Sequence, residues 1–213
     1  MSEPHEESVS VFDAEGRAVG ALPRAQAKRS RLAIGAVNVL LVSAGGEVLL
    51  QHRREDKENG GRWDKTVGGH VGEGESFDEA AVREAGEELF GDGDSPRVRF
   101  ARDEAELSRL LATADLSRAV VFRRAALQLN LRDVRLVPGG PGIRNVTYHV
   151  ASYLGRTDVP LDGFRPQADE IAGLRYAAPA EVDALLVRGE LAPNMAFLWL
   201  THAHALLALA GRP

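Results

Sequence analysis

The sequence predicts an α/β (α+β) fold in which helices pack on a mixed β-sheet. Strand-like and helical segments follow one another in an irregular order, which favours a mixed sheet. The chain has 213 residues, of which 44% are hydrophobic and 27% are charged, so it can bury a core and is not a disordered chain. This length fits one domain with an extension better than two domains. We therefore treat residues 1–213 as a single domain.

Composition excludes several classes of function. The chain has no cysteine, which excludes disulfides, thiolate metal sites, iron–sulfur clusters and cysteine nucleophiles, and which suits a reducing cytosol. The formal net charge is −5, so we expect no non-specific attraction to nucleic acid or to an anionic membrane. No apolar run approaches the roughly 20 residues that span a bilayer, and the acidic N-terminus lacks the pattern of a signal peptide. We expect a soluble, cytoplasmic protein.

The first strands are predicted by apolar runs separated by turns. Residues 9–20 read as strand, tight turn and strand, so residues 1–30 form an N-terminal hairpin extension to a core over residues 31–180. Residues 32–42 are almost continuously apolar and, with residues 47–52, predict a central hairpin whose first strand is buried on both faces.

One helix has clear start and stop signals. Ser76 and Glu79 have the spacing of a capping box, in which the two side chains satisfy backbone donors at a helix start. Glycine at position 91 tolerates the left-handed backbone of a helix end. These signals predict a helix over residues 77–90.

The second half of the chain contains weaker signals. Residues 103–124 look helical, with three leucines on one side, and we predict a helical insertion there. Pro179 suits the first turn of a helix that Gly189 can end. The remaining predicted elements are strands at about 126–137, 144–154 and 171–177 and a last helix at about 195–209, so that residues 181–213 are C-terminal helices.

Three glutamates on the predicted 77–90 helix suggest a metal site. Glu84, Glu87 and Glu88 are at i, i+3 and i+4, so their carboxylates share one helix face and repel each other unless a cation lies among them. Oxygen ligands without nitrogen or sulfur suit Mg²⁺, with Mn²⁺ as an alternative. The competing interpretation is a solvated helix face, which is the more frequent meaning of an isolated E-x-x-E-E pattern.

Residues around these glutamates can support such a site. The guanidinium of Arg83 can hold Glu75 in a two-point contact that orients the preceding loop against the helix. The glycine-rich segment 68–74 lets the backbone approach an anion or a metal-bound water closely.

The whole stretch resembles the Nudix box, G-x5-E-x7-R-E-u-x-E-E-x-G-u, in which u is aliphatic. The positions that match are Gly69, Glu75, Arg83, Glu84, Glu87 and Glu88, with Ala85 at the first u. The final glycine of the motif falls on Phe90, and a glycine follows one residue later, which implies a shifted helix end. The resemblance covers about residues 31–180 and implies the α/β/α sandwich of the Nudix hydrolases.

Within that superfamily the chain is most similar to the branch that includes isopentenyl-diphosphate isomerase. The similarity lies in residues 51–54 and 63–70 and in the N-terminal hairpin. Isomerases have a catalytic cysteine just before the glycine–histidine pair, where this chain has Gly68, and a metal-binding histidine that aligns with Ala33. The resemblance therefore does not extend to isomerase activity.

The resemblance implies a Mg²⁺-dependent pyrophosphohydrolase that cleaves a nucleoside diphosphate linked to another group by attack of water on phosphorus. It implies Glu84 and Glu88 as direct metal ligands, and Glu87 as a ligand or as the base for the water. Glu75 would act through Arg83 or a metal-bound water. A further base is expected from outside the motif, and the candidates are Asp169 and Glu170.

Substrate contacts are expected at Gly69 and from residues of the loop before the motif. Arg53, at a strand end, and Arg54 can bind phosphate through guanidinium forks, although charge balance within the loop is the alternative. Trp63 can stack on a base, with packing under the loop as the alternative. Further candidate cations in this loop are Lys57, Arg62 and Lys65.

Three questions stay open in the sequence. His70 matches a metal-binding histidine of the isomerase branch, but its partner histidine is missing, and a backbone-bonded loop histidine is the alternative. The expected partner is a small-molecule diphosphate, and the hairpin and the insertion are candidate contacts of a homodimer. The alternative functions are a non-catalytic regulator that binds a nucleotide ligand and, third, a prenyl-diphosphate isomerase.

Overall fold

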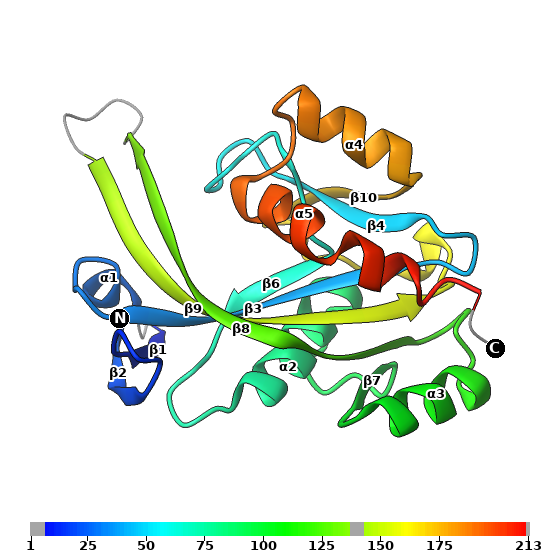
Figure 1. The fold of residues 1–213 in the computed structure, drawn as a ribbon, viewed down its shortest axis with the longest axis horizontal. Helices are drawn as coiled ribbons and strands as arrows, with labels where there is room; N and C mark the ends of the chain where they lie inside the picture. The colour runs from blue at the N-terminus through cyan, green and yellow to red at the C-terminus, as the bar shows by residue number, and fades with distance from the viewer. Residues whose placement is uncertain (1–6, 137–142, 212–213) are drawn as a thin grey trace, which may run out of the picture.

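A mixed β-sheet with helices on both faces forms the molecule (Figure 1). The computed structural model describes residues 7–136 and 143–211. The main path of the sheet runs in the order β10-β4-β3-β9-β8-β7. These strands are β10 (Ile171–Ala177), β4 (Val48–Arg53), β3 (Ala33–Val42), β9 (Ile143–Thr157), β8 (Val120–Leu136) and β7 (Val98–Ala101).

The two faces of β3 bury different helices, which confirms the predicted sandwich. Leu40 and Val42 pack in one cluster with α4 (Pro179–Val187) and α5 (Pro193–Leu207). Val39 and Leu41 pack in another cluster with α2 (Phe77–Phe90). Because successive side chains of a strand point to opposite faces, a strand that is apolar throughout needs a cover on both sides. The predictions of a strand at 171–177 and of helices after Pro179 and at about 195–209 are also confirmed.

The sheet forks beside β3, and this fork makes room for a site. β3 pairs with β9 in parallel along its full length, but it pairs with β4 only at Leu41 and Val42. Beyond that point β6 (Val67–His70) lies along β3, while β5 (Trp63–Asp64) lies along β4. Beside this fork, the Gly68 N–H of β6 donates a hydrogen bond to the Glu88 carboxylate of α2.

The predicted capping signals of α2 are both present. The Ser76 hydroxyl accepts a hydrogen bond from the Glu79 backbone N–H, and the Glu79 carboxylate accepts one from the Ser76 N–H. Gly91 ends the helix in the left-handed conformation with φ 71°. Phe90, at the position of the motif's last glycine, stacks on Phe164 with ring centroids 5.8 Å apart, and the Arg97 guanidinium lies 4.0 Å from its ring centre. The helix end is therefore shifted by one residue, as predicted.

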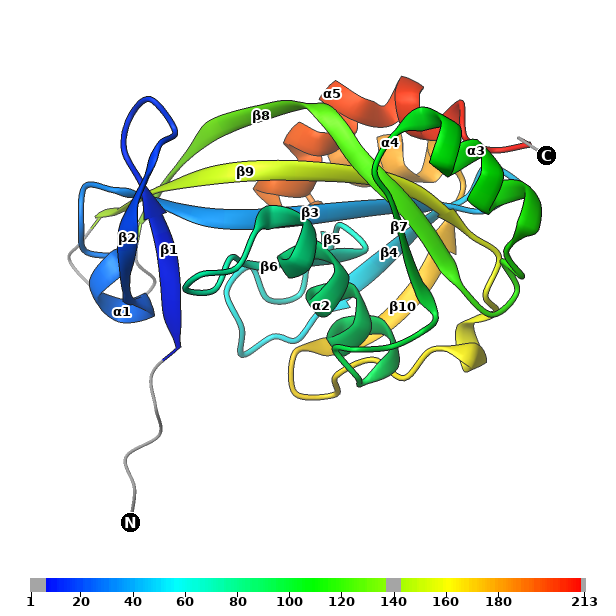
Figure 2. The ribbon, with the colours of Figure 1, turned by 90° about the horizontal axis from the view of Figure 1, so that it is seen from below.

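The N-terminal hairpin is confirmed and is joined to the core. β1 (Ser8–Phe12) pairs with β2 (Ala18–Pro23) and, through Val11 and Phe12, with the start of β3. A short helix that the sequence pattern did not predict, α1 (Arg24–Ala27), follows β2. Figure 2 shows that β8 and β9 extend beyond the central sheet to meet this hairpin.

The predicted helical insertion at 103–124 is wrong in its second half. The helix α3 spans only Glu104–Thr113, with Asp103 as its N-cap, and Val120–Arg124 belong to β8. Val120, Val121 and Phe122 are buried and pair with β7 and β9, where β-branched and aromatic side chains pack better than in a helix. The segment is thus partly an edge of the sheet.

Other boundaries shift by a few residues. The strand predicted at 126–137 begins at Val120, and the one predicted at 144–154 runs from Ile143 to Thr157. The glycine-rich turn predicted between them lies outside the described residues. Among the helices that the structure describes, none has the length and apolar character needed to cross a membrane.

Candidate active site

Arg83 connects the acidic residues of the motif. Its Nε and one Nη donate to the two carboxylate oxygens of Glu75 at 2.8 and 3.0 Å, which is the predicted two-point contact. Its other Nη donates to Glu84 at 3.0 Å and to Glu87 at 3.2 Å. A further bond reaches the His70 carbonyl at 3.0 Å. These bonds, chiefly those to Glu75, raise the pKa of Arg83, and the guanidinium fixes the loop before α2 against the helix.

The carboxylate of Glu84 lies directly on the backbone of Gly69. A side chain at position 69 would overlap with the Glu84 carboxyl group, so only glycine fits there. Glu84 is mostly buried, and burial raises the pKa of its carboxyl group to about 7 against the opposing effect of Arg83. The motif glycine therefore makes the space in which this carboxylate turns toward the fork of the sheet.

Glu88 is more deeply buried and lies one helical turn further along α2. Its side chain accepts a hydrogen bond of 3.2 Å from the Gly68 N–H, and the residue is 3% exposed. Burial, with a smaller contribution from Glu84, raises the pKa of Glu88 to about 8. For both carboxyl groups desolvation is the main cause of the raised pKa, and Arg83 and Lys65 offset it only in part.

The donor set fits Mg²⁺ by its chemistry. Glu84 and Glu88 offer hard oxygen atoms, and the chain has no cysteine that could supply a thiolate ligand. Within residues 7–136 and 143–211, no three acidic or histidine side chains converge into a complete metal cage, since Arg83 draws Glu84 and Glu87 to itself. Mg²⁺ needs no such cage, because it binds through one or two carboxylates and completes its shell with waters and substrate phosphates.

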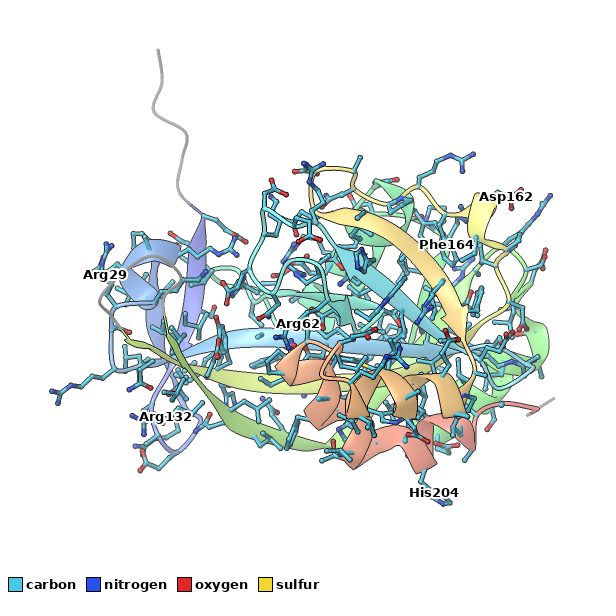
Figure 3. All side chains as sticks on the ribbon, turned by 90° about the horizontal axis from the view of Figure 1, so that it is seen from above. Arg29, Arg62, Arg132, Asp162, Phe164 and His204 are labelled. Atoms are coloured by element: carbon cyan, nitrogen blue, oxygen red, sulfur yellow. The ribbon has the colours of Figure 1, made fainter. Side chains whose placement is uncertain are left out.

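A cavity of about 610 Å³ opens beside these carboxylates, which is the usual size of a small-molecule site. It is lined by residues of the motif, of β3 and β9, of the N-terminal extension and of α5. The lining outside the motif includes Arg24, Lys28, Asn38, Arg53, Lys65, Leu131, Arg132, Tyr148, Glu170, Asn194 and Phe197. In Figure 3, Arg132 lies on the arm of β8 and β9 near the N-terminal hairpin.

The predicted substrate-binding residues divide into two groups. Arg53 and Gly69 line the cavity, and Arg53 is held by the Glu58 carbonyl at 2.8 Å and by Asp64 at 3.7 Å. Arg54 lies outside the lining and bonds to Asp56 and to the Ala168 carbonyl.

Trp63 also lies outside the cavity lining. The guanidinium of Arg175 stacks 3.9 Å from its ring centre, and the His52 ring lies 4.7 Å from it. Its backbone bonds to Glu190 and Ala192 tie β5 to the segment between α4 and α5. Trp63 is partly buried against the cluster that contains α4 and α5, which agrees with the packing alternative.

The structure also gives the positions of His70 and of the two candidate bases relative to the cavity. His70 lines the cavity, and its ring lies 6.2 Å from that of Tyr148. Glu170 lines the cavity too, whereas Asp169 does not. Of the two candidate bases, Glu170 therefore borders the cavity and Asp169 does not.

Sequence reasoning missed several residues of the cavity. The cations Arg24 and Lys28 belong to or directly follow α1, whose short sequence has no recognisable period. Asn38 lies within the apolar strand β3. A polar residue inside a strand that is buried on both faces could have indicated a binding site. Phe197 and Asn194 come from α5, more than 100 residues from the motif, and nothing local indicates that α5 returns to it.

Comparison with known proteins agrees with this architecture. The crystal structure of DR0079 from Deinococcus radiodurans superimposes with a TM-score of 0.56 at 19% identity, covering 90% of this chain and 96% of that chain, which shows a shared fold. An uncharacterised Nudix hydrolase from Rhodococcus erythropolis is 38% identical over 97 residues, which are 44% of this chain and 52% of that protein. The chain thus spans about half the length of that relative.

A longer match links the chain to the isomerase branch. An isopentenyl-diphosphate Δ-isomerase from Nocardia farcinica is 42% identical over 181 residues, which are 84% of this chain and 83% of that protein. The family model described as "NUDIX domain" matches residues 33–196, which contain β3, the acidic motif and the start of α5. With the motif, the sandwich and this match in agreement, the chain belongs to the NUDIX domain family.

Proposed function

We propose that this protein is a Mg²⁺-dependent pyrophosphohydrolase that cleaves the diphosphate linkage of a nucleoside diphosphate joined to another group. The observation that carries the proposal is the pair of buried carboxylates, Glu84 and Glu88, beside a 610 Å³ cavity that is also lined by Arg53, Lys65 and Arg83. A binding protein without turnover has no need to keep two such carboxylates desolvated side by side on one helix face.

Each residue of the motif has a separate task in this proposal. A Mg²⁺ ion held by Glu84 and Glu88 would neutralise charge on the diphosphate and lower the pKa of the attacking water. Arg83 holds Glu84 in place, and Glu75 holds Arg83. Glu87, which is partly exposed beside Arg83, supplies a further ligand or accepts a proton from the water. Glu170, on the opposite side of the fork, is the base candidate from outside the motif.

The direct test is a substrate panel. Nucleotide sugars, dinucleoside polyphosphates and nucleoside triphosphates are incubated with the protein and Mg²⁺ or Mn²⁺, and phosphate-containing products are identified by chromatography. We expect release from at least one class, a loss of ~10³-fold or more for Glu84→Gln and Glu88→Gln, and no loss for Glu190→Gln, an exposed glutamate paired with Arg188. Binding of a nucleotide without any product would instead support a regulator.

Isomerisation of a prenyl diphosphate is the second candidate, because the Nocardia farcinica relative of similar length carries that name. The site does not favour it. Gly68 offers no thiol at the position where isomerases have one, and the end of the Lys65 side chain fills the space that a side chain at 68 would need. Incubation with isopentenyl diphosphate in deuterated water, followed by mass spectrometry, tests the point, and we expect no deuterium incorporation.

A further inference from the structure

Asn38 contributes a polar side chain to the floor of the cavity. It belongs to β3, is 5% exposed and lines the cavity. Among the residues that the structure describes, none bonds to its side-chain amide, and the amide is not enclosed by protein. Because the amide is open to the cavity and has both donors and an acceptor, a polar ligand at this point can bond to it.

Lys65 brings a positive charge to the same floor. Its side chain is 6% exposed, and its Nζ lies 3.4 Å from both carboxylate oxygens of Asp64. An ammonium group has three donors, and this long shared contact with Asp64 leaves donor capacity directed at the cavity. Asp64 is itself fixed by the Lys65 N–H at 2.8 Å and by Arg53 at 3.7 Å, so the charge is held in place.

Gly68 brings the two groups together. Asn38 and Gly68 are directly opposite each other in the antiparallel pair of β3 and β6, so their side-chain positions share one face, about 4.5–5.5 Å apart. The lysine tail lies over Gly68, with its Nζ 2.6 Å from the place of a Cβ at that residue. The ammonium therefore occupies the position of the missing side chain, beside the amide of Asn38.

We propose that Lys65 and Asn38 form a phosphoryl-binding subsite for the diphosphate of the substrate. This inference rests on the proposed function, because it places the subsite next to Glu88, whose carboxylate bonds to the Gly68 N–H. Lys65 supplies charge, and the Asn38 Nδ2 donates to a non-bridging phosphate oxygen. Lys65 and Asn38 favour an anion, whereas the carboxylates of Glu84 and Glu88 repel a bare one. The ligand that suits both pairs of residues is a diphosphate accompanied by a divalent cation.

Binding of methylenediphosphonate, a diphosphate that cannot be hydrolysed, tests the subsite. Isothermal calorimetry with Mg²⁺ present is compared for the wild type, Lys65→Met, Asn38→Leu and the control Arg99→Met, which removes an exposed cation from β7. We expect affinity to fall ~10–100-fold for Lys65→Met and ~10-fold for Asn38→Leu, with Arg99→Met unchanged. Wild-type affinity in both cavity variants, or no binding by the wild type, would overturn the proposal.

A second set of variants tests the geometry independently of folding. Gly68→Ala places a methyl group on the lysine tail, so it should weaken diphosphonate binding by about as much as Lys65→Ala. In the Lys65→Ala background the same change should have no further effect. Additive losses in the double variant, with all proteins showing cooperative melting, would contradict the proposed overlap of the two positions.

The readouts separate this inference from the proposed function. Mg²⁺ binding in the absence of diphosphonate should be retained in Asn38→Leu, because that side chain is not a proposed metal ligand. If diphosphonate binding depends on Lys65 and Asn38 while no substrate is hydrolysed, the subsite stands and the hydrolase proposal fails. If hydrolysis occurs with the same KM in both variants, the hydrolase proposal stands and the subsite fails.

Discussion

Arg83 and Glu75 form two parallel hydrogen bonds, of 2.8 and 3.0 Å, that join the glycine-rich loop to the helix bearing the acidic residues. The same guanidinium reaches Glu84, so the position of a proposed metal ligand depends on a contact made eight residues earlier in the chain. Arginine suits this task because its planar fork can serve several acceptors at once.

Replacing Arg83 by lysine should therefore lower activity far more than stability. A lysine keeps the charge but cannot hold Glu75 and Glu84 together, so we expect kcat to fall ~10–100-fold, as is typical when the orientation of a metal ligand is lost. Steady-state kinetics on the substrate found in the panel measure the effect. Arg17→Lys, in an exposed ion pair with Asp13, is the matched control. A variant with wild-type kcat would remove Arg83 from the proposed mechanism.

Mg²⁺ should stabilise the folded chain. A ligand present at 100 times its dissociation constant stabilises by about 2.7 kcal/mol, which for a domain of this size raises Tm by ~5–10 °C. The experiment is differential scanning calorimetry at pH 8.5, above the pKa values of about 7 and 8 given for Glu84 and Glu88. EDTA should reverse the shift, and Glu88→Gln should reduce it. If Mg²⁺ raises the Tm of a variant that carries both Glu84→Gln and Glu88→Gln as much as it raises that of the wild type, the ion binds elsewhere.

Gly69→Ala should inactivate the protein because of a single methyl group. That methyl would overlap with the Glu84 carboxyl group, so the carboxylate must leave its position beside the cavity. We expect a loss of ~100-fold or more in kcat/KM, with the protein still folded. Gly173→Ala, where a methyl group meets nothing within 4 Å, controls for the substitution itself. Unchanged kinetics for the first variant would show that Glu84 can act from another rotamer.

His202 should make the folded state sensitive to acid. Burial on α5 lowers the pKa of His202 below its usual 6.5, so the unfolded chain binds its proton more readily than the folded chain. The stability associated with the neutral ring is present above pH 6.5 and is lost as pH falls through 6.5 toward the lower, folded-state pKa. Urea unfolding at pH 7.5 and pH 5.5 should show a smaller loss for His202→Leu than for the wild type.

The chain offers a matched control for this experiment. His204 is exposed on the same helix and points away from the body of the molecule in Figure 3. His204→Leu should keep the pH dependence of the wild type. If His202→Leu and His204→Leu behave alike, the acid sensitivity arises from other groups.

The parts of the fold set by short-range chemistry could be predicted from the sequence. Ser76 and Glu79 satisfy backbone donors within one turn, and Gly91 needs only its own backbone conformation, so both ends of α2 follow from local residues. The glutamates of the motif are also local, because a helical repeat alone places them on one face.

Features that depend on distant partners could not be predicted. Val120–Arg124 continue the pattern of a helix in the sequence, yet pairing with β7 and β9 makes them a strand. The relation of Lys65 to Asn38 exists only because β3 and β6 pair in a particular register, which residue spacing does not reveal. For the same reason the cavity contributions of α1 and α5 had no signal in the sequence.

At the fork beside β3, the short strands β5 and β6 pair with different neighbours, β4 and β3, and not with each other. Asn38 and Gly69 belong to one side of the fork, while Arg53 and Asp64 belong to the other. A ligand that contacts both sides would bridge two short strands, β5 and β6, that pair with different neighbours. A bound substrate would therefore join the two branches of the fork, and its departure would leave them connected only through β3 and β4.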